Sequence, residues 1–354
     1  MRILYLTNIH NPYRDEFFEQ LGWECDLTVL FEERVDDNRD ASWFREAKEH
    51  SYKEVFLPER ENGPTSRTML NMIRGEWSLV VVGCYNTPKQ MAAISYMHTR
   101  HIPYVLNSDG MVFETRNWLK NNMRRHVLCG ADAYLVAGET CVPSMWREVG
   151  RTVLVVSYPF SSFTAAKVAD LADIAPKRDP RLVLIVGQFE DYKGLDIALE
   201  AAELPGDLRF RFVGSGWKAR KLETLAVEKE LSSIEVVPFL QPDELIKEYL
   251  RAGLFVLPSR QECWGLVVNE AAACGCPIVG TWGAAVEFLS HDYPQFLAEP
   301  GSAESLALTM ESFLVRPESE KRAYSAFLQQ KTCNYTIEGM VCAHLDLFDE
   351  AVKR

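Results

Sequence analysis

Short apolar runs alternate along the chain with longer segments of helical periodicity, which is typical of βα units in parallel sheets. The longest helical pattern covers Phe113–Cys129. In the first half of the chain, the apolar runs predict strands at Ile3–Thr7, Leu27–Phe31, Val55–Leu57, Leu79–Gly83, Tyr104–Asn107, Tyr134–Ala137 and Val153–Ser157. In the second half, they predict strands at Leu182–Val186, Phe210–Val213, Ile234–Phe239, Leu254–Leu257 and Ile278–Gly280.

The periodicity fades after Pro159. Residues 161–180 are rich in polar, alanine, proline and basic residues, which predicts a linker. We therefore expect an α/β protein of two doubly wound, Rossmann-like domains. The expected bounds are 1–160 for the first domain, 161–180 for the linker, 181–335 for the second domain and 336–354 for a terminal helix.

Composition agrees with a soluble protein of two domains. The chain has 354 residues, of which 47% are hydrophobic and 25% are charged. No apolar run approaches the roughly 18 residues that span a bilayer, and Met1–Thr7 reads as a first strand rather than a signal peptide. These features predict a cytoplasmic location. The nine cysteines lack metal-ligand spacing and are expected to be reduced packing thiols.

Charge is distributed unevenly. The net charge is −12, which argues against nucleic acid as a partner. Residues 62–160 nevertheless carry more basic than acidic side chains, which makes the second half of the first domain a candidate surface for an anionic partner.

The segment Pro258–Pro277 contains two glutamates with seven residues between them. Glu262 follows an apolar strand, and Glu270 lies about two turns into a helix that begins near Gly265. Ligands of open α/β sheets bind at this edge, where paired carboxylates suit vicinal sugar hydroxyls. Free amides at the helix start favour a diphosphate. The candidate donors around Glu262 are Arg260, Cys263, Trp264, Gly265 and Leu266.

This segment resembles the Glu-x7-Glu signature of retaining GT-B glycosyltransferases, specifically glycosyltransferase family 4 of the bacterial polysaccharide and glycolipid type. The match includes Pro258-Ser259, Gly265-Leu266 and Gly275-x-Pro277. The resemblance implies two Rossmann-like domains facing an interdomain cleft, with the terminal helix packing back on the first domain. It also implies a nucleotide-sugar donor, with a UDP-sugar favoured. Glu262 would contact the donor sugar and Glu270 the ribose.

A second donor segment is similar to the family pattern, with one departure. Lys193 fits the lysine that faces the donor diphosphate, in a segment that begins Val186-Gly187. The family's arginine position holds Gln188, so a bidentate cation becomes a neutral amide. Arg260 or Arg14 would have to supply the missing charge. The alternative for Lys193 is a solvated lysine at a helix start.

Two further turns are similar to family loops near the nucleotide. Gly214 and Gly216 either line the site or form a tight βα turn. Pro238 and Phe239 either contact the nucleobase through the main chain or end a strand.

In the first domain, polar residues follow two predicted strands. His10, Asn11 and Arg14 are candidates for acceptor or phosphate contacts, although a lone histidine is more often structural. Asp109 is a candidate catalytic residue that accepts a sugar hydroxyl; its alternative role is the N-cap of the helix that follows.

Arg116, Lys120 and Arg124 recur every four residues along one predicted helix face. We refer to them as the basic stripe. They predict contact with a lipid-linked or other anionic acceptor and peripheral attachment to the inner face of the membrane. The alternative is a solvated helix face.

The resemblance therefore implies a retaining, metal-independent hexosyltransferase or related enzyme. No Asp-x-Asp pair follows a strand to hold a metal, and no cofactor is expected besides the nucleotide-sugar substrate. The acceptor would be a carbohydrate, a lipid-linked sugar or another glycoconjugate. Two alternatives stay open: a catalytically silent GT-B protein that stabilises a partner or binds glycan, and a sugar-phosphate synthase or phosphorylase.

Overall fold

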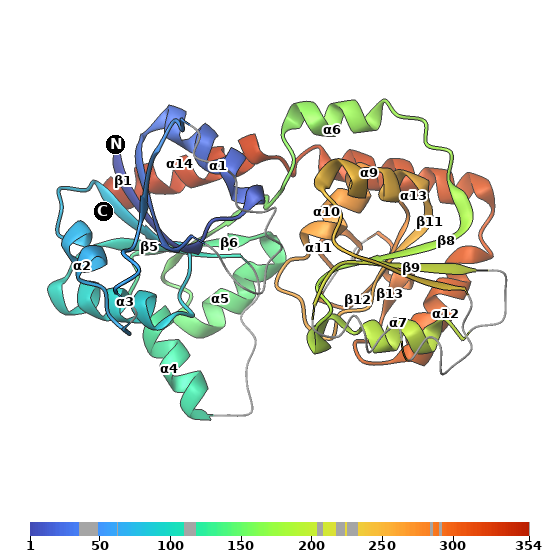
Figure 1. Cartoon of the computed structure of the whole chain (residues 1–354), viewed down its shortest axis with the longest axis horizontal. Coiled ribbons are helices and arrows are strands. Elements are labelled where there is room, and N and C mark those ends of the chain that lie inside the picture. Colours follow the sequence, from blue (N-terminus) through green and yellow to red (C-terminus); the bar gives the residue numbers. More distant parts are fainter. Residues whose placement is uncertain are drawn as a thin grey trace. The chain divides into compact units, whose positions relative to one another are not determined.

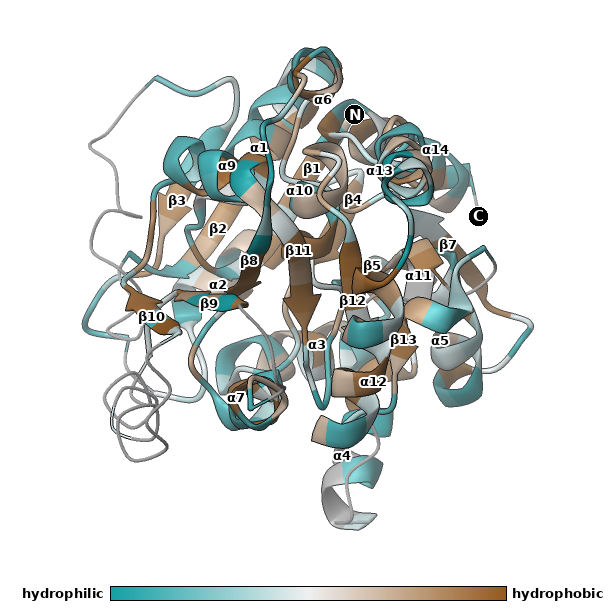
Figure 2. Cartoon of the chain, turned by 90° about the vertical axis from the view of Figure 1, so that its right-hand side faces the viewer, coloured by the Kyte–Doolittle hydropathy of each residue, from teal (hydrophilic) through white to brown (hydrophobic). Residues whose placement is uncertain are grey.

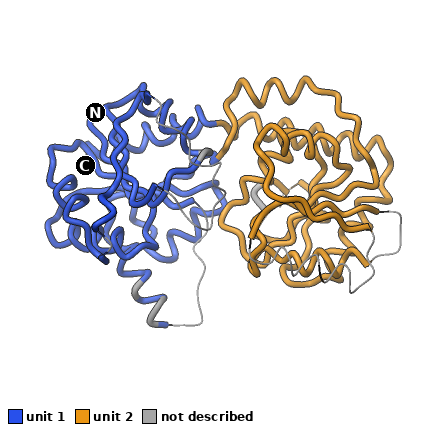
Figure 3. The backbone as a smooth tube through the Cα atoms, in the orientation of Figure 1, with its two compact units in different colours: residues 1–160, 337–354 blue, residues 161–336 orange. Residues whose placement is uncertain are grey.

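The structure is a computed structural model. It describes residues 1–34, 49–61, 63–109, 118–203, 208–216, 224, 233–283, 286–289 and 292–353. The chain divides into two compact units, which are coloured separately in Figure 3. Unit 1 comprises residues 1–160 and 337–354, and unit 2 comprises residues 161–336.

Unit 1 is a parallel sheet with helices on both faces (Figure 1). The strand order is β3-β2-β1-β4-β5-β6-β7, so the order reverses between β1 and β4. The strands are β1 (Arg2–Ile9), β2 (Asp26–Glu33), β3 (Lys53–Phe56), β4 (Leu79–Val82), β5 (Tyr104–Ser108), β6 (Ala133–Ala137) and β7 (Leu154–Tyr158). The helices are α1 (Pro12–Glu24), α2 (Arg67–Ile73), α3 (Pro88–Arg100), α4 (Trp118–Leu128), the 3-10 turn η2 (Glu139–Cys141), α5 (Val142–Val149) and α14 (Ile337–Lys353).

Unit 2 contains a second parallel sheet, with strand order β10-β9-β8-β11-β12-β13. This is the doubly wound order, in which the direction of winding reverses between β8 and β11. The strands are β8 (Asp179–Val186), β9 (Arg209–Val213), β10 (Ile234–Val237), β11 (Ala252–Leu257), β12 (Ile278–Thr281) and β13 (Leu297–Ala298). The helices are α6 (Ala165–Ala172), η3 (Asp191–Lys193), α7 (Leu195–Ala201), α9 (Pro242–Arg251), α10 (Leu266–Ala273), α11 (Val286–Leu289), η4 (Pro294–Phe296), α12 (Ala303–Leu314) and α13 (Glu318–Thr332).

The predicted α/β class with two Rossmann-like units is confirmed. Every predicted strand overlaps a strand of the structure, because runs such as β11 and β12 are hydrophobic along their length and buried by helices (Figure 2). The predicted strand Ile234–Phe239 is too long: β10 ends at Val237. Pro238 follows and cannot donate a ladder hydrogen bond.

Residues 161–180 were predicted to be a linker, but they contain helix α6. Thr164 caps this helix, because its side chain accepts a hydrogen bond from the Lys167 amide. Val168 and Leu171, nearly one turn apart, are buried. The apolar periodicity of an eight-residue helix is too short to be recognised in a segment rich in alanine and charged residues.

Helix α14 is part of unit 1, where it packs against α1 and β7. His344 on α14 is buried, and its ring contacts Phe17 and Tyr158. Burial lowers the pKa of His344 to about 3, so the imidazole is neutral at physiological pH.

Candidate functional site

The carboxyl ends of β8 and β11 lie side by side at the switch point of unit 2. The two strands pair in parallel, with Leu254 opposite Val183. The turn η3, which ends at Lys193, follows β8, and the loop that holds Glu262 follows β11. Connections leave the two strands in opposite directions here, which opens the usual ligand crevice of a doubly wound sheet.

Lys193 and Glu262, which are far apart in sequence, form an ion pair at this edge. Lys193 Nζ lies 2.5 Å from Glu262 Oε2, and the Ser259 hydroxyl donates to the same oxygen at 3.2 Å. The carbonyl of Ser259 accepts a 2.6 Å hydrogen bond from the Thr281 hydroxyl, which fixes the loop. Both charged side chains are mostly buried, at 14% and 8% exposure. The structure thus brings two predicted site residues into direct contact.

Gly194 permits the close approach of η3 to the end of β11. Its φ is 65°, and a Cβ atom there would lie 2.1 Å from the Pro258 carbonyl oxygen. The Arg260 amide also donates to the Tyr192 carbonyl at 2.7 Å, which ties the two loops together. Any side chain at position 194 would therefore push Lys193 and Glu262 apart.

We expect Gly194→Ala to destabilise the protein by about 3 kcal/mol, from the left-handed backbone and the steric clash together. Gly301→Ala is the control, because Gly301 also has a positive φ, of 85°, but a Cβ atom added there would meet no atom within 4 Å. That variant should lose about 1 kcal/mol from the backbone conformation alone. Urea unfolding of both variants measures the difference, and equal losses would show that the approach to Pro258 is not constrained.

The cation expected to replace the missing family arginine is already paired. Arg260 donates to both carboxylate oxygens of Asp196 at 2.8 Å. The hydrogen bond to Asp196 raises the pKa of Arg260 further. Gln188 accepts a long, 3.4 Å hydrogen bond from the Tyr192 hydroxyl. Asp196 was not found from the sequence, since an acidic residue in a helix's first turn carries no specific signal.

Helix α10 begins at Leu266, directly after Gly265, whose φ is 85°, and no side-chain hydrogen bond caps it. The Val268 amide donates to the Gly265 carbonyl at 2.8 Å, and the amides of Gly265 and Leu266 remain candidates for ligand contact. Cys263 is exposed beside them. Trp264 differs, because its indole is buried, donates to Asn269 Oδ1 at 3.1 Å and stacks on Tyr335. Only the main chain of Trp264 is a candidate for ligand contact.

Glu270 lies on α10 and is bonded from two sides. The Ser162 hydroxyl donates to Oε1 at 2.9 Å, and the Tyr249 hydroxyl donates to Oε2 at 3.1 Å. Burial raises the pKa of Glu270 to about 7, against the lowering effect of these two bonds. Neither partner was singled out from the sequence, because neither lies in the Glu-x7-Glu segment.

The remaining donor-side residues lie at the same edge of the sheet. The Gly187 amide donates to Val213, and the Gly214 amide donates to Val237. A Cβ on Gly214 would lie 1.9 Å from the Gly187 carbonyl oxygen, and one on Gly216 would lie 2.9 Å from the Phe189 amide nitrogen. These glycines are therefore required by close packing of the loops. The loop with Pro238 and Phe239 follows β10.

In unit 1, the candidates after β1 are mainly engaged with one another and with neighbours. Asn11 caps α1 through the Arg14 amide, and His10 lies 2.9 Å from Asp15. Arg14 is buried, donates to Tyr5 at 3.0 Å and pairs with Asp109. The charge of Arg14 is thus used within unit 1. Asp109 keeps 39% of its side chain exposed.

The basic stripe is not a continuous exposed face. Arg116 and the side chain of Lys120 lie outside the described part of the chain. Arg124 keeps only 17% exposure and pairs with Glu148 on α5 at 3.3 Å. No described helix is long and apolar enough to cross a membrane. Within the described ranges, no cluster of three or more His, Cys, Asp or Glu side chains is arranged to hold a metal ion.

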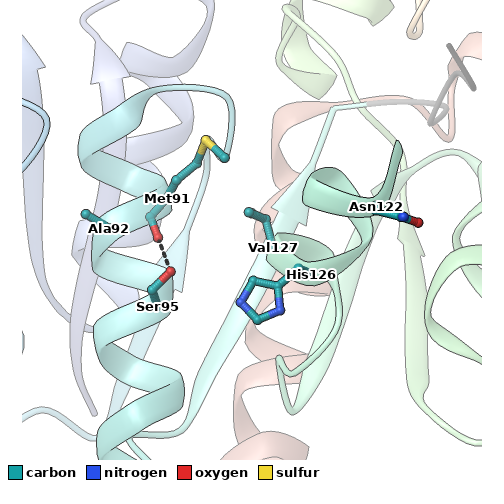
Figure 4. Close-up of a pocket in the computed structure, with 6 residues that line it drawn as sticks. All are labelled: Met91, Ala92, Ser95, Asn122, His126 and Val127. Atoms are coloured by element: carbon teal, nitrogen blue, oxygen red, sulfur yellow. Dashed lines mark hydrogen bonds between the residues drawn. The ribbon is translucent and has the colours of Figure 1, made fainter. Parts of the chain in front are cut away.

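A cavity of about 450 Å³ lies elsewhere, between α3 and α4 (Figure 4). Its lining is mainly apolar and consists of Met91, Ala92, Ser95, Asn122, His126 and Val127. None of these residues is a predicted site residue, and the cavity contains no paired carboxylates or cation. We therefore place the candidate site at β8 and β11, where the polar groups converge.

The fold matches solved structures over the whole chain. Sucrose-phosphate synthase from Thermosynechococcus elongatus aligns with a TM-score of 0.75 at 18% identity and covers 99% of both chains. HepE from Anabaena, in complex with UDP-glucose, aligns with a TM-score of 0.75 at 16% identity and covers 99% of this chain and 100% of its own. The chain has the GT-B fold.

The match to a family model lies within unit 2. Residues 169–327 match the family model of group 1 glycosyl transferases, so this part of the GT-B chain carries the family pattern. An uncharacterized glycosyltransferase of Methanocaldococcus jannaschii is 33% identical over 35% of each chain. The D-inositol 3-phosphate glycosyltransferase of Mycolicibacterium smegmatis is 39% identical over 28% of this chain and 25% of its own length. These alignments thus span about a quarter to a third of the relatives' lengths.

Proposed function

We propose that the protein is a retaining, metal-independent glycosyltransferase that moves a sugar from a nucleotide-sugar donor to an acceptor hydroxyl. The observation that supports this most is the buried Lys193–Glu262 pair beside α10 and Glu270, at the switch point of unit 2. The group 1 glycosyl transferase pattern covers the same residues. A UDP-sugar is the favoured donor, because HepE of the same fold was solved with UDP-glucose.

In this proposal, each group at the edge has a distinct task. Both contacts of Glu262 with described residues use Oε2, and Oε1 is the oxygen proposed to accept a donor-sugar hydroxyl. Lys193 and the first amides of α10 offset the charge that develops on the leaving diphosphate. Arg260 contributes little, since Asp196 already binds it. Glu262 acts as a positioning acceptor rather than as the nucleophile.

The acceptor belongs to surface polysaccharide, glycolipid or glycoconjugate synthesis in the cytoplasm, with peripheral membrane contact. The basic excess of residues 62–160 and the exposed carboxylate of Asp109 support an acceptor in unit 1. The paired state of Arg124 weakens the argument for the basic stripe.

A catalytically silent GT-B protein that binds glycan or a partner is the second candidate. It is favoured by Gln188 at the position of the family arginine and by the engagement of Arg260 with Asp196. A panel of UDP-, GDP- and ADP-sugars separates the two. Transferase function predicts release of the nucleoside diphosphate from one donor, with proton NMR showing that the α configuration of the sugar is kept. No release from any donor supports the silent protein.

We expect this donor turnover to persist in EDTA at a concentration on the order of 5 mM, which chelates accessible divalent metal ions. Lys193 and the α10 amides supply the positive potential in this proposal. Release of nucleoside diphosphate is measured with and without chelator after dialysis. Inactivation that Mg²⁺ or Mn²⁺ restores would require a metal in the donor complex.

A further inference from the structure

The carboxylate of Glu270 is oriented by two hydroxyls from distant parts of the chain. Ser162 Oγ donates to Oε1 at 2.9 Å, and Tyr249 on α9 donates to Oε2 at 3.1 Å. Tyr249 is fully buried, and burial raises its pKa well above the usual value, so its hydroxyl remains a donor. Each carboxylate oxygen keeps a lone pair for a further hydrogen bond.

Ser162 lies between hydrogen-bonded neighbours at the start of unit 2. Unit 2 begins at Ser161, whose hydroxyl accepts from the Phe163 amide at 3.1 Å. Thr164 then caps α6. Ser162 thus lies between the Ser161–Phe163 hydrogen bond and the cap of α6, and its hydroxyl donates to Glu270 on α10.

Burial raises the pKa of Glu270, and two hydrogen bonds oppose that rise. No basic side chain pairs with Glu270 within the described ranges. Tyr249 on α9 and Cys274 at the end of α10 interact with Glu270, and Lys167 on α6 and Arg178 act on Cys274. From α13, which also packs against α10, the neutral amide of Gln329 donates to the Ala273 carbonyl at 3.5 Å. The two neutral donors therefore favour the ionised carboxylate against burial.

We propose that Ser162 is a positioning residue of the nucleotide site: it orients Glu270 towards the vicinal hydroxyls of the donor ribose without touching the nucleotide itself. This inference rests on the proposed function. It extends the donor site beyond the Glu-x7-Glu segment to the first turn of unit 2. The sequence separation of 108 residues explains why no local motif reveals it.

The test compares Ser162→Ala with Ser161→Ala and Ser162→Thr. The parent protein is first tested for binding of UDP, GDP and ADP. Calorimetry then measures the Kd of each variant for the nucleotide that the parent binds, between pH 6 and pH 8.5. We expect Ser162→Ala to raise the Kd about 5-fold at pH 7 and to move the pH midpoint of binding upwards. The kcat at saturating donor should change less than about 2-fold, because transition-state contacts remain. Ser162→Thr retains the hydroxyl and should bind like the parent.

Ser161→Ala is the matched control, since it removes a buried serine hydroxyl next in the chain, one that donates to the Phe163 carbonyl and accepts from the Phe163 amide. It should lower stability without moving the pH midpoint. Nucleotide-free protein gives an independent measurement. Ser162→Ala should raise the pKa of Glu270. The pH dependence of urea unfolding, compared with that of Glu270→Gln, measures this change.

The outcomes separate the two proposals. If the parent binds nucleotide and Ser162→Ala binds it with the same Kd and pH midpoint, the positioning role of Ser162 is wrong and the donor site stands. If the parent binds none of the three nucleotides, the proposed function and this inference both fail. The unfolding experiment then still reports whether Ser162 and Glu270 are coupled.

Discussion

Glu262→Gln should lower donor turnover by about 100-fold or more, on the scale of losing one preorganised contact to the reacting group. The substitution keeps the size of the side chain but removes the charge that holds Lys193 and replaces one of the two acceptor oxygens with an amide group that donates. The affinity for nucleoside diphosphate should change by less than about 3-fold, because Glu262 faces the sugar in this account. Steady-state kinetics and calorimetry measure the two quantities.

Stability has to be controlled in that experiment. Removing one partner of a buried pair leaves Lys193 uncompensated, which destabilises the fold. Activity is therefore measured well below the melting temperature of each variant. Gln261→Ala is the control, because its exposed side chain lies next to Glu262 in the same loop. A parental kcat in Glu262→Gln would remove Glu262 from the catalytic site.

Glu270→Gln should weaken nucleoside diphosphate binding about 10-fold, since a charged acceptor for buried hydroxyls becomes neutral. The kcat at saturating donor should stay within about 3-fold of the parent, because the ribose contact is made in both ground and transition states. Glu304→Gln, an exposed glutamate at the start of α12, serves as the control. Equal loss of nucleotide affinity in the Glu262 and Glu270 variants would show that the two roles are assigned wrongly.

The same variant tests the pH dependence of folding. Glu270 ionises near pH 7 in the folded protein and near pH 4.5 in the unfolded chain. The unfolded state therefore releases this proton first, and stability falls as pH rises from about 4.5 to about 7. Because Glu270 is only partly buried by surface area, we expect a loss of about 2 kcal/mol. Glu270→Gln should lack this loss in urea unfolding, so that it becomes the more stable protein at pH 8.

Much of the fold can be predicted from the sequence, because buried parallel strands consist of continuous runs of apolar residues. β13 could not be predicted, since two residues form no pattern. Helix α6 was hidden by its short length and by alanines that fit a linker equally well. The topology of each sheet follows from the right-handed βα rule more than from any single residue.

The candidate site was predictable only where local spacing carries the chemistry. Glu262, Glu270 and Lys193 lie in recognisable strand–loop–helix contexts. Ser162 could not be found in this way, because its contact depends on packing between distant segments. Arg14 and Arg260 show the converse: each looks like a free cation in sequence, and each is paired with an aspartate in the fold.

The central claim is that unit 2 binds a nucleoside diphosphate at the carboxyl ends of β8 and β11. Calorimetric titration of the full chain with UDP, GDP and ADP tests it most directly, with Lys193→Met as the comparison. The account predicts one-to-one binding of at least one nucleotide, weakened about 10-fold or more by loss of the Lys193 charge. No binding of any of the three at millimolar concentration, or equal binding by Lys193→Met, would contradict it.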